Sequence, residues 1–148
     1  MAKLTVNEAS GDFTHVVKLT AADIVAIGNG GQDTILTLPA GSAVDLVGVV
    51  NNVDIVGSSD LVIDVGTTTG DPDEFINALD VSAMTVNLPT FNSGDLMYQS
   101  AATTTVKNGS HPVSAVSADT AVVIEITDAD AASITAGEVI IGFRVIDL

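Results

Sequence analysis

Short runs of apolar residues, often alternating with polar ones, recur along the chain between clusters of glycine, proline, asparagine and aspartate. In residues 60–66, for example, Leu61, Ile63 and Val65 fall on one face of an extended segment. Side chains of a β-strand point alternately to its two sides, so this pattern predicts strands buried on one face. We expect strands in residues 13–27 (with a kink or a short helical turn at 20–23), 35–38, 44–50, 60–66, 84–91, 102–109, 121–127 and 138–146.

The number and spacing of these runs indicate the fold class. About eight or nine short strands at intervals of roughly 8 to 20 residues are typical of an antiparallel β-sandwich or barrel. The sequence shows no regular alternation of strands with helices, no repeat period and no low-complexity linker. It therefore predicts a single all-β domain over residues 13–148, preceded by an N-terminal arm at residues 1–12.

One segment, residues 71–80, has a different pattern. Asp71 can cap a helix, and Pro72 stands where the first helical turn tolerates proline. The apolar residues that follow at roughly helical spacing are Phe75, Ile76 and Leu79. We therefore expect one short helix near residues 71–80.

Composition and charge narrow the possible functions. The chain is 47% hydrophobic with few aromatic residues, which predicts a core of β-branched and aliphatic side chains. Four lysines and arginines stand against nineteen acids, giving a net charge of −15, and phosphate binding needs clustered cations. We expect no nucleic-acid partner. No apolar run approaches the roughly 20 residues of a membrane span, and no signal-peptide pattern opens the chain, so we expect no membrane partner either.

The acidic stretch within residues 71–80 raises the question of a cation site. Asp71, Asp73 and Glu74, with Asp80 after them, could supply oxygen ligands to Ca²⁺, although their spacing does not fit an EF-hand loop. We favour the alternative that Asp71 caps the predicted helix and that its two neighbours complement the helix N-terminus. The same choice arises at residues 127–130, where the two acids Asp128 and Asp130 are expected to form a solvated turn. The sequence thus predicts neither a metal site nor a cofactor.

Nothing in the sequence predicts catalytic residues. Paired carboxylates serve glycosidases, but the chain has no tryptophan and a single tyrosine, Tyr98, from which to build a sugar platform. His15 and His111 have no nucleophile in a G-x-S-x-G turn to act on. The glycine-rich residues 28–31 are not followed by the Lys-Ser/Thr pair of a phosphate loop, so we interpret them as a turn.

The order of the segments resembles that of small decoration (cement) proteins on the heads of tailed bacteriophages, especially phages of marine bacteria and cyanobacteria. The residues that carry the resemblance are the stretches LTAADI (19–24), TLPAGSAVDLVGVV (37–50), LVIDVGTTTGDPDEFINALDVS (61–82) and TAGEVIIGFRVIDL (135–148). The resemblance implies a jelly-roll sandwich that assembles as a homotrimer. It also implies a place on the outer surface of the virion capsid, where the trimer would clamp neighbouring major capsid subunits.

These lines together predict a noncatalytic structural protein that decorates and stabilises a phage capsid. The alternative is a virion fibre or surface module that binds a host glycan or receptor. In either case a strongly acidic surface suits the exterior of a particle, because it keeps the protein soluble. We further hypothesise that the arm reaches a capsid subunit or a neighbouring protomer, with Leu4 and Val6 as contact residues ahead of the polar stretch at 10–12.

Overall fold

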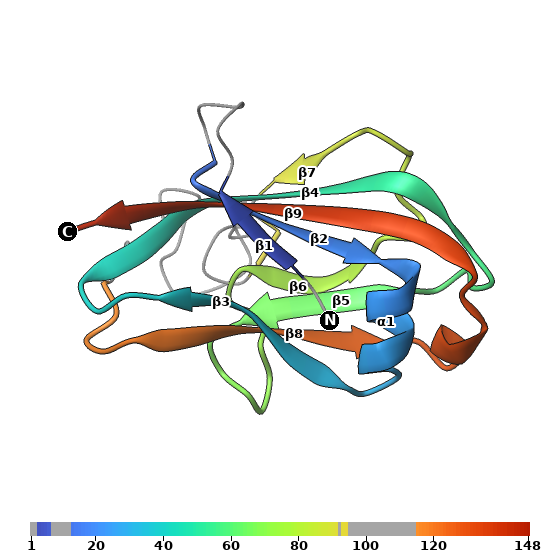
Figure 1. Cartoon of the computed structure of the whole chain (residues 1–148), viewed down its shortest axis with the longest axis horizontal. Helices are drawn as coiled ribbons and strands as arrows, with labels where there is room; N and C mark the ends of the chain where they lie inside the picture. Colours follow the sequence, from blue (N-terminus) through green and yellow to red (C-terminus); the bar gives the residue numbers. More distant parts are fainter. Residues whose placement is uncertain (1–2, 7–12, 92, 95–114) are drawn as a thin grey trace, which may run out of the picture.

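Two antiparallel β-sheets pack face to face in the computed structural model, with one short helix at an end of the sandwich (Figure 1). The structure describes residues 3–6, 13–91, 93–94 and 115–148. Within these residues nine strands are formed. The first sheet has the order β1 (Lys3–Val6), β2 (His15–Thr20), β9 (Ala136–Asp147), β4 (Ser42–Val56) and β7 (Thr90–Phe91). The second has the order β3 (Gln32–Leu38), β8 (Thr120–Thr127), β5 (Val62–Gly66) and β6 (Ile76–Asp80).

The path of the chain between the sheets is that of a jelly roll. From β2 to β5 each strand lies in the opposite sheet from the one before it, and from β6 to β9 the alternation repeats. β9 therefore lies between β2 and β4, and β8 lies between β3 and β5. Interlocked connections of this kind are typical of two-sheet jelly rolls. The predicted all-β antiparallel sandwich is confirmed.

The core lies between the two sheets and is built from alternate residues of the central strands. On β9 the inward residues Val139, Ile141 and Phe143 are fully buried. The facing residues of the other sheet include those predicted from the alternation in residues 60–66. The residues of β8, of β5 and of the position just before β5 that are at most 1% exposed are Val122, Ile124, Ile126, Leu61, Ile63 and Val65. Aliphatic side chains thus fill the space between the sheets, as the composition indicates.

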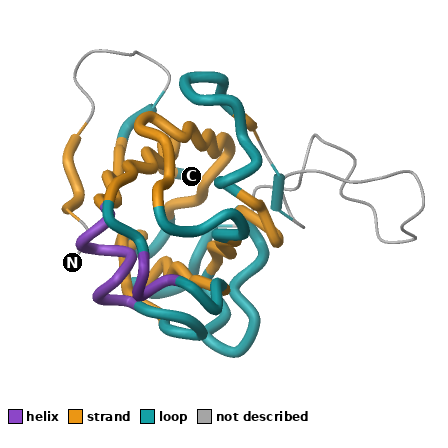
Figure 2. The backbone as a smooth tube through the Cα atoms, turned by 90° about the vertical axis from the view of Figure 1, so that its right-hand side faces the viewer, coloured by secondary structure: helices purple, strands orange, loops and turns teal. Residues whose placement is uncertain are grey.

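Among the described residues the α-helix is α1 (Ala21–Ile27), drawn in purple in Figure 2, which leads from β2 of one sheet to β3 of the other. Its first turn carries a capping box: Thr20 Oγ1 accepts from the backbone N–H of Asp23, and the Asp23 carboxylate accepts from the N–H of Thr20 at 2.9 Å. Ile24, 1% exposed, anchors the helix to the core. The expected kink or short helical turn at 20–23 is thus the start of a seven-residue helix.

The helix predicted near residues 71–80 is wrong. Residues 76–80 form β6, which pairs with β5, and Asp71 caps no helix. The register explains the misleading spacing, because Ile76 lies opposite Val65 whereas Leu79 lies opposite Ile63. Between these pairs two residues of β6 therefore face one of β5, which is a β-bulge, and Ala78 within it has a φ of 46°. A bulge places residues i and i+3 on one face, as a helix does.

Other predicted boundaries also change. The strand expected over residues 84–91 is reduced to the two residues of β7, because residues 81–89 form turns and an irregular connection. The strand expected at 102–109 lies outside the described residues. β4 is longer than predicted and runs along β9 for most of its length, interrupted by bulges. The N-terminal arm contributes β1, an edge strand that pairs with β2, and its proposed extent over residues 1–12 stays a prediction.

Candidate functional site

A hollow of about 460 Å³ lies on the outer face of the five-stranded sheet. Because the odd-numbered residues from Val139 to Phe143 point into the core, the even-numbered residues of β9, such as Ile140 and Gly142, point outward into this hollow. The hollow extends from β2 to the loop before β7. The residues that line it are Phe13, Val16, Gly48, Val49, Val50, Asn87, Pro89, Phe91, Ile140 and Gly142.

Two glycines form the floor of the hollow. Gly48 of β4 lies directly opposite Gly142 of β9 in the antiparallel register. A Cβ atom at Gly48 would lie 2.7 Å from the ring of Phe13 and 3.0 Å from that of Phe91, and one at Gly142 would lie 2.8 Å from Phe13. Glycine within a strand often marks a close approach by another group. Here the missing side chains let two phenylalanine rings rest on the sheet.

The two rings stack on each other and remain open to solvent. Phe13 and Phe91 have ring centroids 6.4 Å apart and nearly parallel planes, 10° from each other. Phe91 is 52% exposed, and Leu88 in the preceding loop is 61% exposed. A contiguous apolar area of this kind on a soluble domain commonly marks a surface that contacts another molecule. Aromatic side chains are also enriched in protein–protein interfaces.

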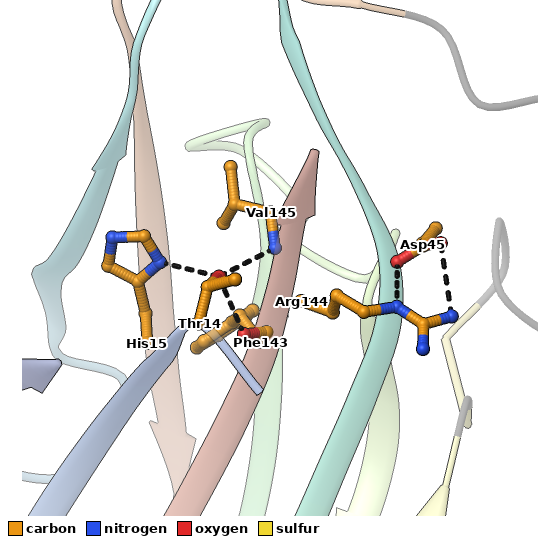
Figure 3. Close-up of polar contacts among 6 residues, drawn as sticks. All are labelled: Thr14, His15, Asp45, Phe143, Arg144 and Val145. Atoms are coloured by element: carbon orange, nitrogen blue, oxygen red, sulfur yellow. Dashed lines mark hydrogen bonds and ion pairs between the residues drawn. The ribbon is translucent and has the colours of Figure 1, made fainter. Parts of the chain in front are cut away.

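Ion pairs lie on either side of the hollow. They involve Glu138 and Arg144, the outward-facing residues of β9 that come before Ile140 and after Gly142. Toward one end, Lys18 Nζ lies 2.8 Å from Glu138 Oε2, and Asn52 donates to the other oxygen at 2.7 Å. Toward the other end, Arg144 forms a fork with Asp45, with Nε–Oδ1 and Nη2–Oδ2 distances of 2.7 and 3.1 Å (Figure 3). Each of these cations is paired with an acid of the same sheet. The residues that line the hollow between the two ion pairs are mainly apolar.

The pKa of the Glu138 carboxyl reflects these contacts. The hydrogen bond from Lys18, helped by the one from Asn52, lowers the pKa although partial burial opposes the shift. A carboxyl whose pKa is lowered by folding stabilises the fold above its unfolded pKa, and this contribution disappears as the pH falls through the folded pKa. The ion pair beside the hollow is therefore present at neutral pH.

Thr14 fastens the chain segment that carries Phe13. Its hydroxyl accepts a hydrogen bond from the backbone N–H of Val145 at 2.8 Å and donates to the carbonyl of Phe143 at 3.2 Å (Figure 3). His15 Nδ1 lies 2.8 Å from the same oxygen. Because the hydroxyl has a single hydrogen, donation to Phe143 requires the tautomer in which His15 Nδ1–H is the donor. His15 is thus placed in a structural contact, and His111 lies outside the described residues.

The acids singled out within residues 71–80 are spread over separate contacts. The Glu74 carboxylate accepts from the backbone N–H of Thr67 at 2.8 Å and from the hydroxyl of Thr68 at 2.6 Å, which ties down the turn after β5. Asp71 lies exposed in that loop, and Asp80 accepts from the N–H of Ala83 at 3.2 Å. Their predicted role in capping a helix is wrong. Among the described residues, these acids do not form a cluster of three carboxylates.

Asp64 on β5 lies in an electrostatically unfavourable place. Burial raises the pKa of its carboxyl, and the charges of Glu125 and Asp71 raise it further, whereas a hydrogen bond from the N–H of Ala78 at 2.6 Å opposes the shift. Glu125 lies directly opposite Asp64 on β8. Like charges that face each other across an antiparallel pair are destabilising.

We therefore expect the Asp64→Asn variant to be more stable than the parent at pH 7, by roughly 0.3–1 kcal/mol after allowance for solvent screening. Asparagine keeps an oxygen for the Ala78 N–H and removes the charge. Because folding raises the pKa of Asp64, the penalty is fully present above the folded pKa and disappears as the pH falls toward the unfolded value of 3.8. Urea unfolding at pH 7 and pH 4 measures this change.

Asp33→Asn is the matched control for this prediction. Asp33 also accepts a backbone hydrogen bond, from Thr34 at 2.9 Å, and its substitution changes the net charge equally. An equal gain in both variants would attribute the effect to the overall negative charge, and the local explanation would be wrong.

Residues 128–131 form a turn, in which the N–H of Ala131 donates to the carbonyl of Asp128 at 3.1 Å, but Asp128 is not solvated as predicted for residues 127–130. Its side chain is only 2% exposed, whereas Asp130 is exposed. The residue follows the last position of β8, and its backbone N–H donates to the Asn29 side chain at 2.9 Å. The prediction is therefore wrong for Asp128.

The two residues expected to contact a partner lie in β1. Leu4 stands opposite Val17, and Val6 stands opposite His15, at the edge of the five-stranded sheet. An edge strand offers backbone groups for pairing with another chain. A partner contact through Leu4 and Val6 stays a prediction.

The hollow could not be located from the sequence. Its lining residues come from four separate parts of the chain, and only the register of β2, β9 and β4 brings them together. The available signal was Gly48 and Gly142, each inside a run that otherwise reads as a strand.

Comparison with known proteins gives a likeness in fold. No protein-family model and no curated protein matches this chain. Among solved structures, a chain of the cyanophage Pam1 capsid asymmetric unit matches with a TM-score of 0.56 at 15% identity, covering 99% of this chain and 84% of that one. A chain of the acid-stable capsid of Helicobacter pylori bacteriophage KHP30 matches with a TM-score of 0.46 at 17% identity, over 100% of this chain and 98% of that one.

The Pam1 chain has a similar fold over 99% of this chain. The resemblance to phage head proteins read from the segment order is confirmed as a likeness of fold. In the part of the chain that the structure describes, no helix has the length and apolar character needed to cross a membrane.

Proposed function

We propose that the protein is a noncatalytic structural component of a phage virion. It decorates the outer surface of the capsid as a homotrimer, binds between major capsid subunits and stabilises their contacts. The observation that supports this best is the fold shared with a chain of a cyanophage capsid asymmetric unit over 99% of this protein. A fold alone does not define a function, so the surface of the molecule supplies the second line of argument.

The hollow on the five-stranded sheet is the proposed contact surface for a capsid subunit. Its stacked rings, the half-buried Phe13 and the exposed Phe91, rest on the glycine floor, and the hydrogen bonds of Thr14 hold the segment that carries Phe13. Rigid aromatic groups lose little conformational entropy on binding, which favours them as anchors in interfaces. The ion pairs on either side hold their charges locally and leave the apolar centre for the partner.

The lining is less suited to a host glycan. Of the described residues that line the hollow, Asn87 alone offers a polar side chain. Sugar sites combine an aromatic surface with several hydrogen-bonding groups that fix orientation. The virion fibre or surface module that binds a glycan or receptor is therefore the weaker candidate, and it becomes one outcome of the test.

Two measurements on the purified protein test the proposal. Light scattering should give a mass near three times 14.9 kDa, and the protein should co-sediment at saturating stoichiometry with phage heads that lack it. A monomer that does not sediment with heads would contradict the proposal. Retention on host cells or glycan arrays without binding to heads would favour the surface module.

We expect Phe91→Ser to lower the affinity for heads by at least about tenfold, the effect of losing roughly 1.4 kcal/mol from an exposed aromatic anchor. Its unfolding should be little changed because the ring is 52% exposed. Val25→Ser on α1 is the control, since Val25 is 38% exposed and does not line the hollow. Equal binding of the two variants would show that the hollow is not the contact surface.

A further inference from the structure

Three carboxylates meet at the end of the four-stranded sheet near α1, where β8 finishes (Figure 1). Asp60 precedes β5, and Asp128 and Asp130 follow β8. One oxygen from each of the three lies within 4.8 Å of the others. The pairing of Val62 with Thr127 brings the two segments together, so the cluster joins residues far apart in the sequence.

Asp128 sets this cluster apart from an ordinary group of surface acids. The residue is 2% exposed, and its Oδ1 accepts from the backbone N–H of Asp130 at 2.8 Å. Its other oxygen, Oδ2, is buried and has no hydrogen-bond partner among the described residues. A buried carboxylate oxygen normally accepts hydrogen bonds or binds a cation, because leaving it without either is costly.

Two cations of the described residues, Lys18 and Arg144, are engaged elsewhere. Lys18 pairs with Glu138, and Arg144 pairs with Asp45, both on the five-stranded sheet. The side chain that approaches Asp60 is neutral, since Ser58 Oγ donates to Asp60 Oδ1 at 3.0 Å. The cluster thus holds three formal negative charges with one oxygen unpartnered.

Backbone hydrogen bonds fix the segments around the cluster without using any of the three carboxylates. Thr135 donates its N–H to the carbonyl of Val56 at 2.9 Å, which holds the segment before Asp60 against the segment after Asp130. Asp128 donates its backbone N–H to the Asn29 side chain at 2.9 Å. The carboxylates are therefore positioned by the fold, which lowers the cost of ordering ligands around an ion.

We propose that Asp60, Asp128 and Asp130 bind a calcium ion. Ca²⁺ binds oxygen ligands at about 2.3–2.6 Å in flexible geometry, so ligand oxygens across one ion lie up to about 4.8 Å apart. The oxygens of this cluster lie within that limit. Mg²⁺ requires shorter distances, stricter octahedral geometry and several retained waters, and it fits a partly buried site less well.

The ion connects the turn before β5 to the 3-10 helix η1 (Ala131–Ser133) after β8. These segments lie at one end of the sandwich. Binding of Ca²⁺ stabilises the folded state because the three ligands are brought together only by folding. The site would make the stability of the protein depend on the calcium concentration around it.

Calorimetric titration of the chelator-treated protein with CaCl₂ tests the proposal. At an ionic strength of about 0.15 M, which screens nonspecific attraction to a negatively charged surface, we expect saturable binding of one ion per chain. In thermal unfolding, free Ca²⁺ at 100 times its Kd should raise the folding equilibrium constant about 100-fold. No saturable binding at about 1 mM CaCl₂, well above the Kd of sensor sites, would overturn the proposal.

Matched variants separate the site from general electrostatics. Asp60→Asn and Asp54→Asn each remove one exposed acid and change the net charge equally, but Asp54 lies outside the cluster. We expect Asp60→Asn to weaken Ca²⁺ binding by at least about tenfold, the effect of losing one charged ligand. Asp54→Asn should bind as the parent does. Equal weakening in both would overturn the site.

Two further measurements complete the test. If Asp60→Asn does not fold, Asp130→Asn provides the same comparison, because Asp130 is also exposed. Titration with MgCl₂ should give weaker binding, and tighter binding of Mg²⁺ would overturn the assignment to calcium. These experiments use the free protein, so their outcome is independent of whether it binds capsids.

Discussion

Phe143→Ala should lower the free energy of unfolding by about 3–5 kcal/mol, the usual cost of truncating a fully buried phenylalanine. Phe143 is 0% exposed and lies on β9, between Val47 of β4 and His15 of β2. Its ring meets that of Phe75, from the loop before β6, edge to face at 6.4 Å and 80°. The ring thus connects the two sheets, and its removal leaves a cavity that the strands cannot close without moving apart.

The size of this effect matters because domains of this kind are stabilised by about 5–15 kcal/mol in total. Urea unfolding followed by far-ultraviolet circular dichroism measures the loss. Phe91→Ala is the control, since it makes the same chemical change at a ring that is 52% exposed, and we expect a loss below about 0.5 kcal/mol. Similar losses in the two variants would mean that Phe143 does not occupy a tightly packed core.

The core could be predicted from the sequence because strands have a simple period. Leu61, Ile63 and Val65 alternate along the chain and are all buried in the structure. Alternation of this kind depends on local geometry alone. Where a bulge interrupts the ladder, local geometry is ambiguous: Ile76 and Leu79 have the spacing of a helix and nevertheless lie in β6. The choice between the two is made by pairing with β5, which the sequence does not display.

The helix α1 shows the opposite error. Thr20 and Asp23 have the spacing of a capping box, and both of its hydrogen bonds form. The signal was therefore present. The prediction of a kink or a short helical turn at residues 20–23 stops short of the full helix, and the apolar residues after it, Ile24, Val25 and Ile27, have the β-propensity of a strand. Burial of Ile24 and the connection between two sheets override that preference in the folded protein.

The hollow and the carboxylate cluster could not be predicted from the sequence for a different reason. Gly48 and Gly142 are distant in the chain and meet only in the register of β4 with β9. Asp128 follows a strand and looks like a solvated turn residue, but it is buried, and a carboxylate oxygen of the distant residue Asp60 lies within 4.8 Å of one of its own. Each site is created by the packing of separate segments. Residue types and spacing within one segment therefore could not locate it.

Gly57→Ala should lower the free energy of unfolding by about 3 kcal/mol or more, a larger loss than Gly41→Ala or Gly70→Ala. Two causes add. Gly57 has a φ of +105°, which an L side chain rarely adopts. A Cβ at this position would also lie 2.1 Å from the carbonyl oxygen of Ser133 and 2.9 Å from the Cα of Ile134. These atoms belong to backbone, so they cannot move aside as a flexible side chain would.

Two other glycines separate the causes. Gly41 has a φ of +85° and nothing within 4 Å of an added Cβ, so Gly41→Ala should cost only the backbone term, about 1 kcal/mol. Gly70 has neither an unusual φ nor a neighbour within 4 Å. Gly70→Ala should therefore be neutral or stabilise by up to about 1 kcal/mol, since alanine restricts the unfolded chain. Urea unfolding of the three variants under identical conditions should give the order Gly57, Gly41, Gly70 from the largest loss to none.

The contrast between Gly57→Ala and Gly41→Ala isolates the contact of the turn with η1. A difference of about 2 kcal/mol between the two losses would measure the cost of forcing residue 57 away from Ser133, beyond the cost of its φ. Because Asp60 follows in the same turn, that displacement would also separate its carboxylate from Asp128. Losses of equal size would mean that the turn can shift freely against η1, and the close packing that holds this end of the sandwich would then contribute nothing to stability.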